Sequence, residues 1–174
     1  MMMKSALAVL SIAALTGCAG IDVAQYKAEK PAFDLARYFN GTVDGWGMFQ
    51  DRSGKVVRRF TVRIDARWDG NRGTLDEHFE FSDGEKQNRI WTLVKDGDRY
   101  TGTAGDVVGT GQGIQQGNAF NMRYVLRVPW AGRTIDVDMD DWMWRIDDQT
   151  VLNRTAMSKF GFRVGEVTLS LRKR

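Results

Sequence analysis

Apolar and polar residues alternate along the segment from Val56 to Trp68. One parity carries large apolar side chains, whereas the other carries charged residues and threonine, and Arg58 is the main exception. Successive side chains of a β-strand point to opposite faces, so a period of two predicts a long strand with one buried face. This pattern constrains the fold more than any other feature, because similar runs fill the chain after Gly41.

Short turn signals separate these runs. They are rich in glycine, aspartate and asparagine, and they include Asp69-Gly70, Asp83-Gly84, Asp96-Gly97-Asp98 and Gly117-Asn118. They divide the chain into about nine or ten strands, and such short connections favour antiparallel neighbours. We therefore predict an all-β fold, an antiparallel up-and-down meander that closes into a β-barrel of about 8–10 strands. A two-sheet sandwich is the alternative.

The first residues predict where the protein is located. Lys4 precedes a short apolar run that ends in Leu15-Thr16-Gly17-Cys18, and Cys18 is the single cysteine of the chain. The run is too short to span a bilayer, and its end has the lipobox pattern of bacterial lipoproteins. We predict a lipoprotein signal peptide over 1–17, a lipidated tether over 18–32 that begins at Cys18, and a single barrel domain over 33–174. The alternative is a cysteine that merely ends a signal peptide.

The residue after Cys18 predicts the membrane in which the protein is anchored, and the charge distribution limits the classes of partner. Alanine follows the cysteine where aspartate would signal retention in the inner membrane, so we predict a lipid anchor in the outer membrane that faces the periplasm. The net charge is +3, and both signs are interleaved except at Arg172-Lys173-Arg174. A nucleic-acid binder needs a basic block or stripe, so no nucleic-acid partner is predicted. The oligomeric state stays open.

Several segments resemble a known family. GWGMFQDRSGKVVRRF, LDEHFEFSDGE, DDWMWRIDDQTVLNRTAMSKFG and VGEVTLSLRK are similar to the uncharacterised Gram-negative lipoproteins grouped as domain-of-unknown-function family 3833. The resemblance runs from about Phe33 to the end. It implies a lipoprotein and a link to membrane fatty-acid modification, and it assigns no catalytic residue. The segment FDLARYFNG also resembles the start of lipocalins, eight-stranded barrels that hold apolar ligands, and this likeness implies a lipocalin-like barrel.

The sequence offers little for catalysis. His78 is the only histidine, so one chain cannot provide a zinc site with several imidazoles, and no serine has a nucleophile-elbow context. The glycine-rich stretch from Gly105 to Gly113 has no following helix to bind phosphate, and its glycines are more typical of bulges and barrel corners. We predict no cofactor, no metal site and no catalytic set; an enzyme is the less favoured class.

The stretch from Asp140 to Trp144, DDWMW, combines two carboxylates with two tryptophans. Ile135, Val137 and Met139 are odd-numbered, whereas Trp142 and Trp144 are even-numbered. A β-bulge near Asp140-Asp141 would keep both apolar sets on the inner face, and it would turn Asp141 inward. A similar change of parity is predicted near Gly165.

Charged residues also interrupt the apolar face of the hairpin around Asp83-Gly84. Glu77 shares its parity with Leu75 and Phe81, and the expected register places Arg89 diagonally across from it. Buried charges require partners, so an ion pair between Glu77 and Arg89 is predicted. The pair can be a purely structural polar plug or an anchor for the polar end of a ligand.

We therefore predict a lipoprotein that binds a fatty acid, lipid or other apolar molecule inside the barrel. Glycines from Gly102 to Gly113 contribute no side chains, so an off-centre apolar pocket is expected beside them. A barrel filled by side chains with a structural or interaction role is the alternative, and an enzyme of membrane fatty-acid modification is a third. The predicted ligand-binding residues are Trp46, Glu77, Phe79, Arg89, Trp91, Tyr124, Asp141, Trp142 and Trp144.

Overall fold

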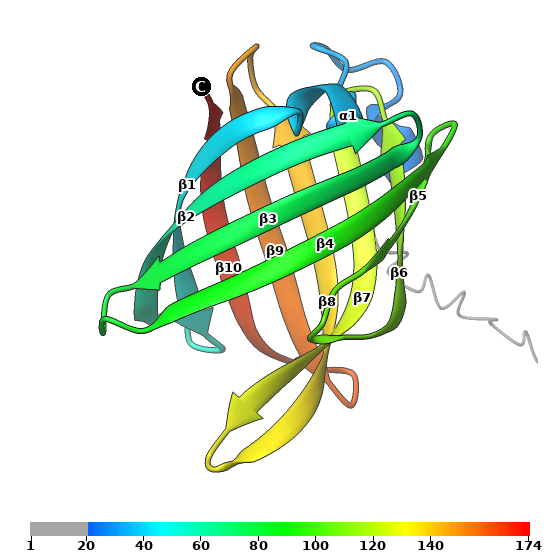
Figure 1. Cartoon of the computed structure of the whole chain (residues 1–174). Helices are drawn as coiled ribbons and strands as arrows, with labels where there is room; N and C mark the ends of the chain where they lie inside the picture. The colour runs from blue at the N-terminus through cyan, green and yellow to red at the C-terminus, as the bar shows by residue number, and fades with distance from the viewer. Residues whose placement is uncertain (1–20) are drawn as a thin grey trace, which may run out of the picture.

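The structure is a computed structural model in which residues 21–174 are described. Cys18 and the predicted signal peptide lie outside these residues. The described part forms a closed barrel of ten strands with a short helix at one end (Figure 1). The elements are η1 Val23–Tyr26, α1 Leu35–Tyr38, β1 Gly41–Asp51, β2 Val56–Asp69, β3 Arg72–Phe81, β4 Lys86–Asp96, β5 Arg99–Thr103, β6 Val107–Gln116, β7 Ala119–Trp130, β8 Arg133–Arg145, β9 Thr150–Lys159 and β10 Phe162–Lys173.

Each strand pairs antiparallel with its sequence neighbours, and β1 also pairs with β10 to close the barrel. The predicted all-β meander is therefore confirmed, and the sandwich alternative is wrong. Closure gives every strand two hydrogen-bonded neighbours and leaves no exposed edge.

The alternation of β2 places its apolar side chains inside the barrel. Phe60, Val62 and Ile64 are buried, whereas Arg59 and Arg63 point outward. The same period continues in β3 and β4, and their inner faces contribute to the main core cluster inside the barrel. Apolar area removed from water stabilises the fold by about 25 cal/mol for each Å².

Helix α1 covers one end of the barrel (Figure 1). Asp34 caps the helix, because its side chain accepts a hydrogen bond from the backbone N–H of Arg37 at 3.2 Å. The side chains of Leu35 and Phe39 are buried and line the interior. The indole Nε1 of Trp68 donates to the carbonyl of Phe39 at 2.8 Å and ties the helix end to β2. This end of the barrel is therefore closed by apolar side chains.

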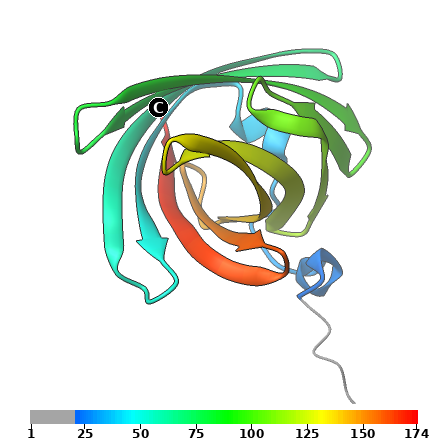
Figure 2. The same cartoon turned by 90° about the horizontal axis from the view of Figure 1, so that it is seen from below.

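The opposite end carries the long β7–β8 hairpin. The hairpin projects beyond the barrel wall in Figure 1, and in the view from below it lies in front of the barrel interior (Figure 2). Its tip residues, Ala131 and Gly132, both have positive φ, as the two central residues of a type I′ turn do. The two ends of the barrel therefore differ, since only one of them is covered by a helix.

The segment before the barrel packs against its outer wall. Val23 in η1 is buried against Ala119 and Trp142. The backbone N–H of Phe33 donates to the carbonyl of Gly117 at 2.7 Å. Residues 21–32, which belong to the predicted tether, thus lie along the barrel.

The predicted bulge near Asp140-Asp141 is wrong. The β7–β8 register is continuous from the pair Ala119 and Trp144 to the pair Trp130 and Arg133. Asp141 faces inward because it keeps the parity of Val137 and Met139, and Trp142 and Trp144 therefore face outward. The sequence does not reveal that η1 covers these two tryptophans, so the apolar outer face was misread as an inner face.

Two other irregularities are confirmed. The β9–β10 register shifts between Arg163 and Gly165. The β6–β7 register shifts between Val108 and Gln112, where Gly109 has a φ of 71°. The glycine-rich stretch is therefore a distorted strand, as its lack of a following helix indicated.

Candidate functional site

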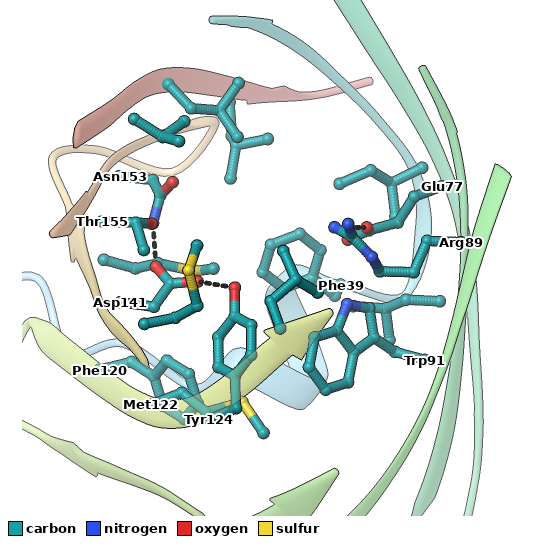
Figure 3. A pocket seen from close by; sticks show the side chains of 18 of the residues that line it. Phe39, Glu77, Arg89, Trp91, Phe120, Met122, Tyr124, Asp141, Asn153 and Thr155 are labelled. Atoms are coloured by element: carbon teal, nitrogen blue, oxygen red, sulfur yellow. Dashed lines mark hydrogen bonds and ion pairs between the residues drawn. The ribbon is translucent and has the colours of Figure 1, made fainter. Parts of the chain in front are cut away.

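A cavity of about 140 Å³ lies inside the barrel. Every strand except β5 and β6 contributes to its wall. Helix α1 covers it at one end (Figure 1). Most lining side chains are apolar or aromatic, and a small number of polar groups face one another across the space (Figure 3). An engineered apolar cavity of about this volume, 150 Å³, binds benzene.

Six of the predicted ligand-binding residues line this cavity. They are Glu77, Phe79, Arg89, Trp91, Tyr124 and Asp141. Their inward orientation is therefore confirmed, whereas their role in ligand binding stays a prediction.

Three predicted lining residues lie elsewhere. Trp46 is on the outer face of β1 and is 53% exposed, beside a shallow outer groove. Trp142 and Trp144 stack on each other on the outer face of β8, with ring centroids 5.7 Å apart. The placement of all three in the cavity is wrong, because their strands keep the opposite parity inside.

The predicted open space beside the strand glycines is also wrong. A Cβ at Gly102 or Gly111 would lie 2.7 Å from the Cε of Met122, and one at Gly113 would lie 2.7 Å from the Cζ of Phe120. Two large side chains of β7 therefore fill the room that the glycines leave. The cavity remains along the axis of the barrel and is not against the β5–β6 wall.

Among residues 21–174, Arg89 is the only cationic side chain that lines the cavity. Its Nε lies 2.9 Å and its Nη2 lies 2.8 Å from Oδ2 of Asp106. Its Nη1 lies 3.6 Å from Oε2 of Glu77, which stands directly opposite it in the β3–β4 ladder. The predicted ion pair is confirmed, but the diagonal register is wrong, because Glu80 pairs with Lys86 around the turn.

Asp106 is a site residue that sequence reasoning missed. It lies in the connection between β5 and β6 and takes the shorter contacts with Arg89. A buried arginine with a single predicted acidic partner was the signal that a second partner was missing. Its position within the glycine-rich stretch concealed it, since that stretch was interpreted through its glycines.

Asp141 lies on the wall opposite Arg89 (Figure 3). Its Oδ1 accepts a hydrogen bond from the amide of Asn153, and its Oδ2 accepts one from the hydroxyl of Tyr124 at 3.4 Å. Asn153 and Thr155 of β9 are buried beside it. Both residues were missed in the sequence analysis, because polar residues occur at odd and even positions of β9 and the pattern therefore does not indicate which face points inward.

Burial raises the pKa of the two carboxyl groups that line the cavity. Removal from water raises the pKa of Glu77 to about 7, and the charges of Asp141 and Asp106 act in the same direction. Arg89 opposes the shift, but Asp106 holds the guanidinium more closely than Glu77 does. Burial likewise raises the pKa of Asp141 to about 6, against hydrogen bonds from Asn153, Thr155 and Tyr124.

The pKa shifts of the neighbouring groups have the same physical origin. Burial and the nearby charge of Asp141 raise the pKa of the Tyr124 hydroxyl, so it remains a hydrogen-bond donor. Burial disfavours the charged form of Arg89, yet Glu77 and Asp106 keep its pKa above the ordinary value. Near pH 7 the cavity thus holds one fixed cation and carboxyl groups that can exchange protons with a bound molecule.

Within residues 21–174, no group of three or more histidine, cysteine or acidic side chains is placed to hold a metal ion. In the same range, no helix has the length and apolar character needed to cross a membrane. The side chain of His78 points to the outer face of β3, where it contacts Asn88 and Asp76.

This chain resembles known proteins in sequence, through a family model, and in fold, through solved structures. The model of a family described as "Protein of unknown function (DUF3833)" matches residues 12–173. Among curated proteins no match is found.

Two solved structures share the fold. The S-type phycobiliprotein lyase CpeS from Guillardia theta is similar at a TM-score of 0.56 and 11% identity, over 79% of this chain and 90% of that chain. A protein of unknown function from the DUF3598 family of Nostoc punctiforme is similar at a TM-score of 0.61 and 16% identity, over 90% of this chain and 53% of that chain. These likenesses agree with the predicted lipocalin-like barrel.

Proposed function

This chain belongs to DUF3833, a family of unknown function, and we propose that it binds a lipid or other apolar small molecule inside its barrel. The observation that supports this proposal is the cavity of about 140 Å³, which is lined mainly by apolar and aromatic side chains and by a few convergent polar groups. Ligand sites of small molecules commonly combine these two kinds of lining. The lipocalin-like barrel of the phycobiliprotein lyase supports a small-molecule role of this kind.

The volume limits what the closed cavity can hold. About 140 Å³ suits a single ring or a short stretch of an acyl chain. A longer molecule would extend toward the end of the barrel opposite α1, where the wall is formed by turns and no helix lies across it (Figure 2). The same modest volume favours a second candidate, a barrel filled by side chains that serves as a structural or interaction module.

We also propose that acyl chains on Cys18 anchor the protein in the outer membrane, with the barrel in the periplasm. The support is the LTGC tetrapeptide and the alanine that follows it. The short segment between Cys18 and η1 would keep the barrel close to the lipid surface from which an apolar ligand could be taken.

Isothermal titration calorimetry with toluene, a neutral apolar probe with a single ring, tests the cavity. We expect saturable binding to the wild-type barrel. Leu75→Trp places a larger ring in the cavity wall and should abolish binding. Ile90→Trp makes a similar change on the exposed face of β4 and should leave binding unchanged. Absence of saturable binding to the wild type would favour the filled barrel.

Native mass spectrometry of the protein extracted from its own membrane identifies a natural ligand. We expect a bound small molecule that is retained by wild type and Ile90→Trp and lost from Leu75→Trp. A ligand retained equally by all three proteins would place binding outside the cavity.

The anchor is tested with Cys18→Ser. Without the thiol no diacylglycerol can be attached, so the protein should leave the membrane fraction or stay as the uncleaved precursor. Normal cleavage and acylation of the variant would contradict the lipoprotein proposal.

A further inference from the structure

The charges around the cavity are unequal. Glu77 and Asp106 contact the one guanidinium, Arg89, and a third carboxyl group, Asp141, lies on the opposite wall of the cavity. If all were ionised, the inner cluster would carry two uncompensated negative charges. Like charges in a low-dielectric interior are costly, so this cluster attracts positive charge or protons.

The single cation is already engaged. Asp106 contacts Arg89 through both Nε and Nη2, with distances of 2.8–3.0 Å. Glu77 approaches Nη1 at 3.6 Å, which is an ion-pair contact too long for a hydrogen bond. An added carboxylate would therefore compete with two resident carboxylates for one guanidinium.

The carboxylate oxygens that line the cavity make fewer short hydrogen bonds than the N–H groups of Arg89 do. Among the described residues, the Glu77 carboxylate receives only the long contact from Arg89, and Oδ2 of Asp141 receives a long hydrogen bond of 3.4 Å from Tyr124. Both groups line the cavity and approach it from opposite walls (Figure 3). A ligand group placed between them would meet acceptors on both sides.

The remaining wall offers no further charge that changes this balance. The neighbouring polar groups are the Tyr124 hydroxyl of β7 and the side chains of Asn153 and Thr155 of β9. The inner faces of β1, β2 and β10 contribute apolar residues to the cavity. Arg58, at the end of β2, is engaged with Asp83 and Glu85 at 2.8 Å and 2.7 Å.

Given that the cavity binds an apolar molecule as proposed above, we propose that the ligand's polar end is a cationic hydrogen-bond donor, such as a primary amine. The amine would lie between Glu77 and Asp141, with its apolar part against Trp91 and Phe39. A carboxylate head, as in a fatty acid, is disfavoured because no free cation faces the cavity. The predicted anchor for the polar end of a ligand thereby becomes a pair of carboxyl groups, Glu77 and Asp141.

Three ligands of equal chain length test the charge preference: hexylamine, hexanol and hexanoate. Each competes with toluene in calorimetric titrations at pH 7.5. We expect hexylamine to bind at least about tenfold more tightly than hexanoate, since like charges brought together across a desolvated contact are strongly unfavourable. Hexanol should fall between them. Equal or tighter binding of hexanoate would overturn the inference and leave the proposed cavity function intact.

Variants identify the groups responsible. Glu77→Gln and Asp141→Asn each remove a charge with little change in shape, so each should reduce the preference for hexylamine while hexanol binding persists. Asp138→Asn removes a charge from the outer face of β8 and should change nothing. An unchanged preference in both inner variants would overturn the assigned position. Failure of the wild type to bind the probe or any of the three ligands would instead overturn the proposed function, and the inference with it.

Discussion

Strand β8 carries an acid on its inner face and two tryptophans on its outer face. Asp141 lies inside the barrel beside Tyr124 and Asn153, and it has no cation within hydrogen-bond distance. One residue later, Trp142 is only 8% exposed although it points away from the barrel, because Val23 and Tyr26 cover it. Globular proteins usually place charge outside and large aromatic rings inside.

The difference between the two faces shows that burial depends on what covers a face. The inner face is buried by the opposite walls of the barrel, and its polar groups are kept there by mutual hydrogen bonds and by Arg89. On the outer face, Trp142 is buried because η1 lies against it. Stability and binding should therefore respond differently to changes on the two faces, and four predictions follow this contrast from the largest effect to the smallest.

Arg89→Met should cause the largest loss of stability, about 3–5 kcal/mol, because Glu77 and Asp106 would be left without their cation. Urea denaturation measures this free energy of unfolding. Arg123→Met is the matched change outside, where the pair of Arg123 and Asp140 is exposed, and it should cost less than about 1 kcal/mol. Equal losses of unfolding free energy in Arg89→Met and Arg123→Met would contradict the proposed difference between the inner and outer faces.

Trp142→Ala should lower the free energy of unfolding by about 3 kcal/mol, near the low end for a buried aromatic residue. The ring packs against Tyr26 and Trp144, and removal leaves a gap beneath η1. Trp46→Ala, at an exposed position, should stay within about 0.5 kcal/mol. Probe binding should persist in Trp142→Ala; its loss would indicate that the two faces are coupled.

The deprotonation of Glu77 should lower the free energy of unfolding by about 2 kcal/mol as the pH rises from 5 to 7.5. The folded pKa of about 7 lies above the unfolded value, so the folded state binds the proton more tightly. Its contribution is full at low pH and is lost as pH rises through about 7. Asp141, with a pKa of about 6, acts with the same sign.

Urea denaturation at several pH values measures this slope. Glu77→Gln should flatten it, whereas Glu80→Gln, on the exposed face of the same strand, should not. A wild-type stability that rises between pH 5 and 7.5 would contradict the buried-acid interpretation.

Tyr26→Ala should have the smallest effect, about 1 kcal/mol, since it removes two tilted ring contacts with Trp142 and Trp144. Limited proteolysis should then cleave more readily within residues 21–32. If neither stability nor cleavage changes, η1 does not hold the outer face.

The sequence alone predicted most of the fold. Alternating residues and closely spaced turns require antiparallel strands, and a meander of this length closes because its apolar face would otherwise remain exposed. The same parity placed Glu77 and Arg89 inside, since each shares its face with apolar neighbours. Asp141 was placed inside through a predicted bulge that the continuous β7–β8 register does not contain. The family resemblance was also confirmed over residues 12–173.

Only the tertiary structure showed which side chains of different strands contact one another and which segments cover the outer face. Parity states which residues share a face, but it cannot state which side chain from another strand meets them. The pairing of neighbouring strands brings Asp106 to Arg89 and Asn153 to Asp141, and packing inside the barrel lets Met122 fill the space over the glycines. Trp142 is buried outside the barrel for the same reason: η1 reaches it through space, and no local period in the sequence encodes that contact.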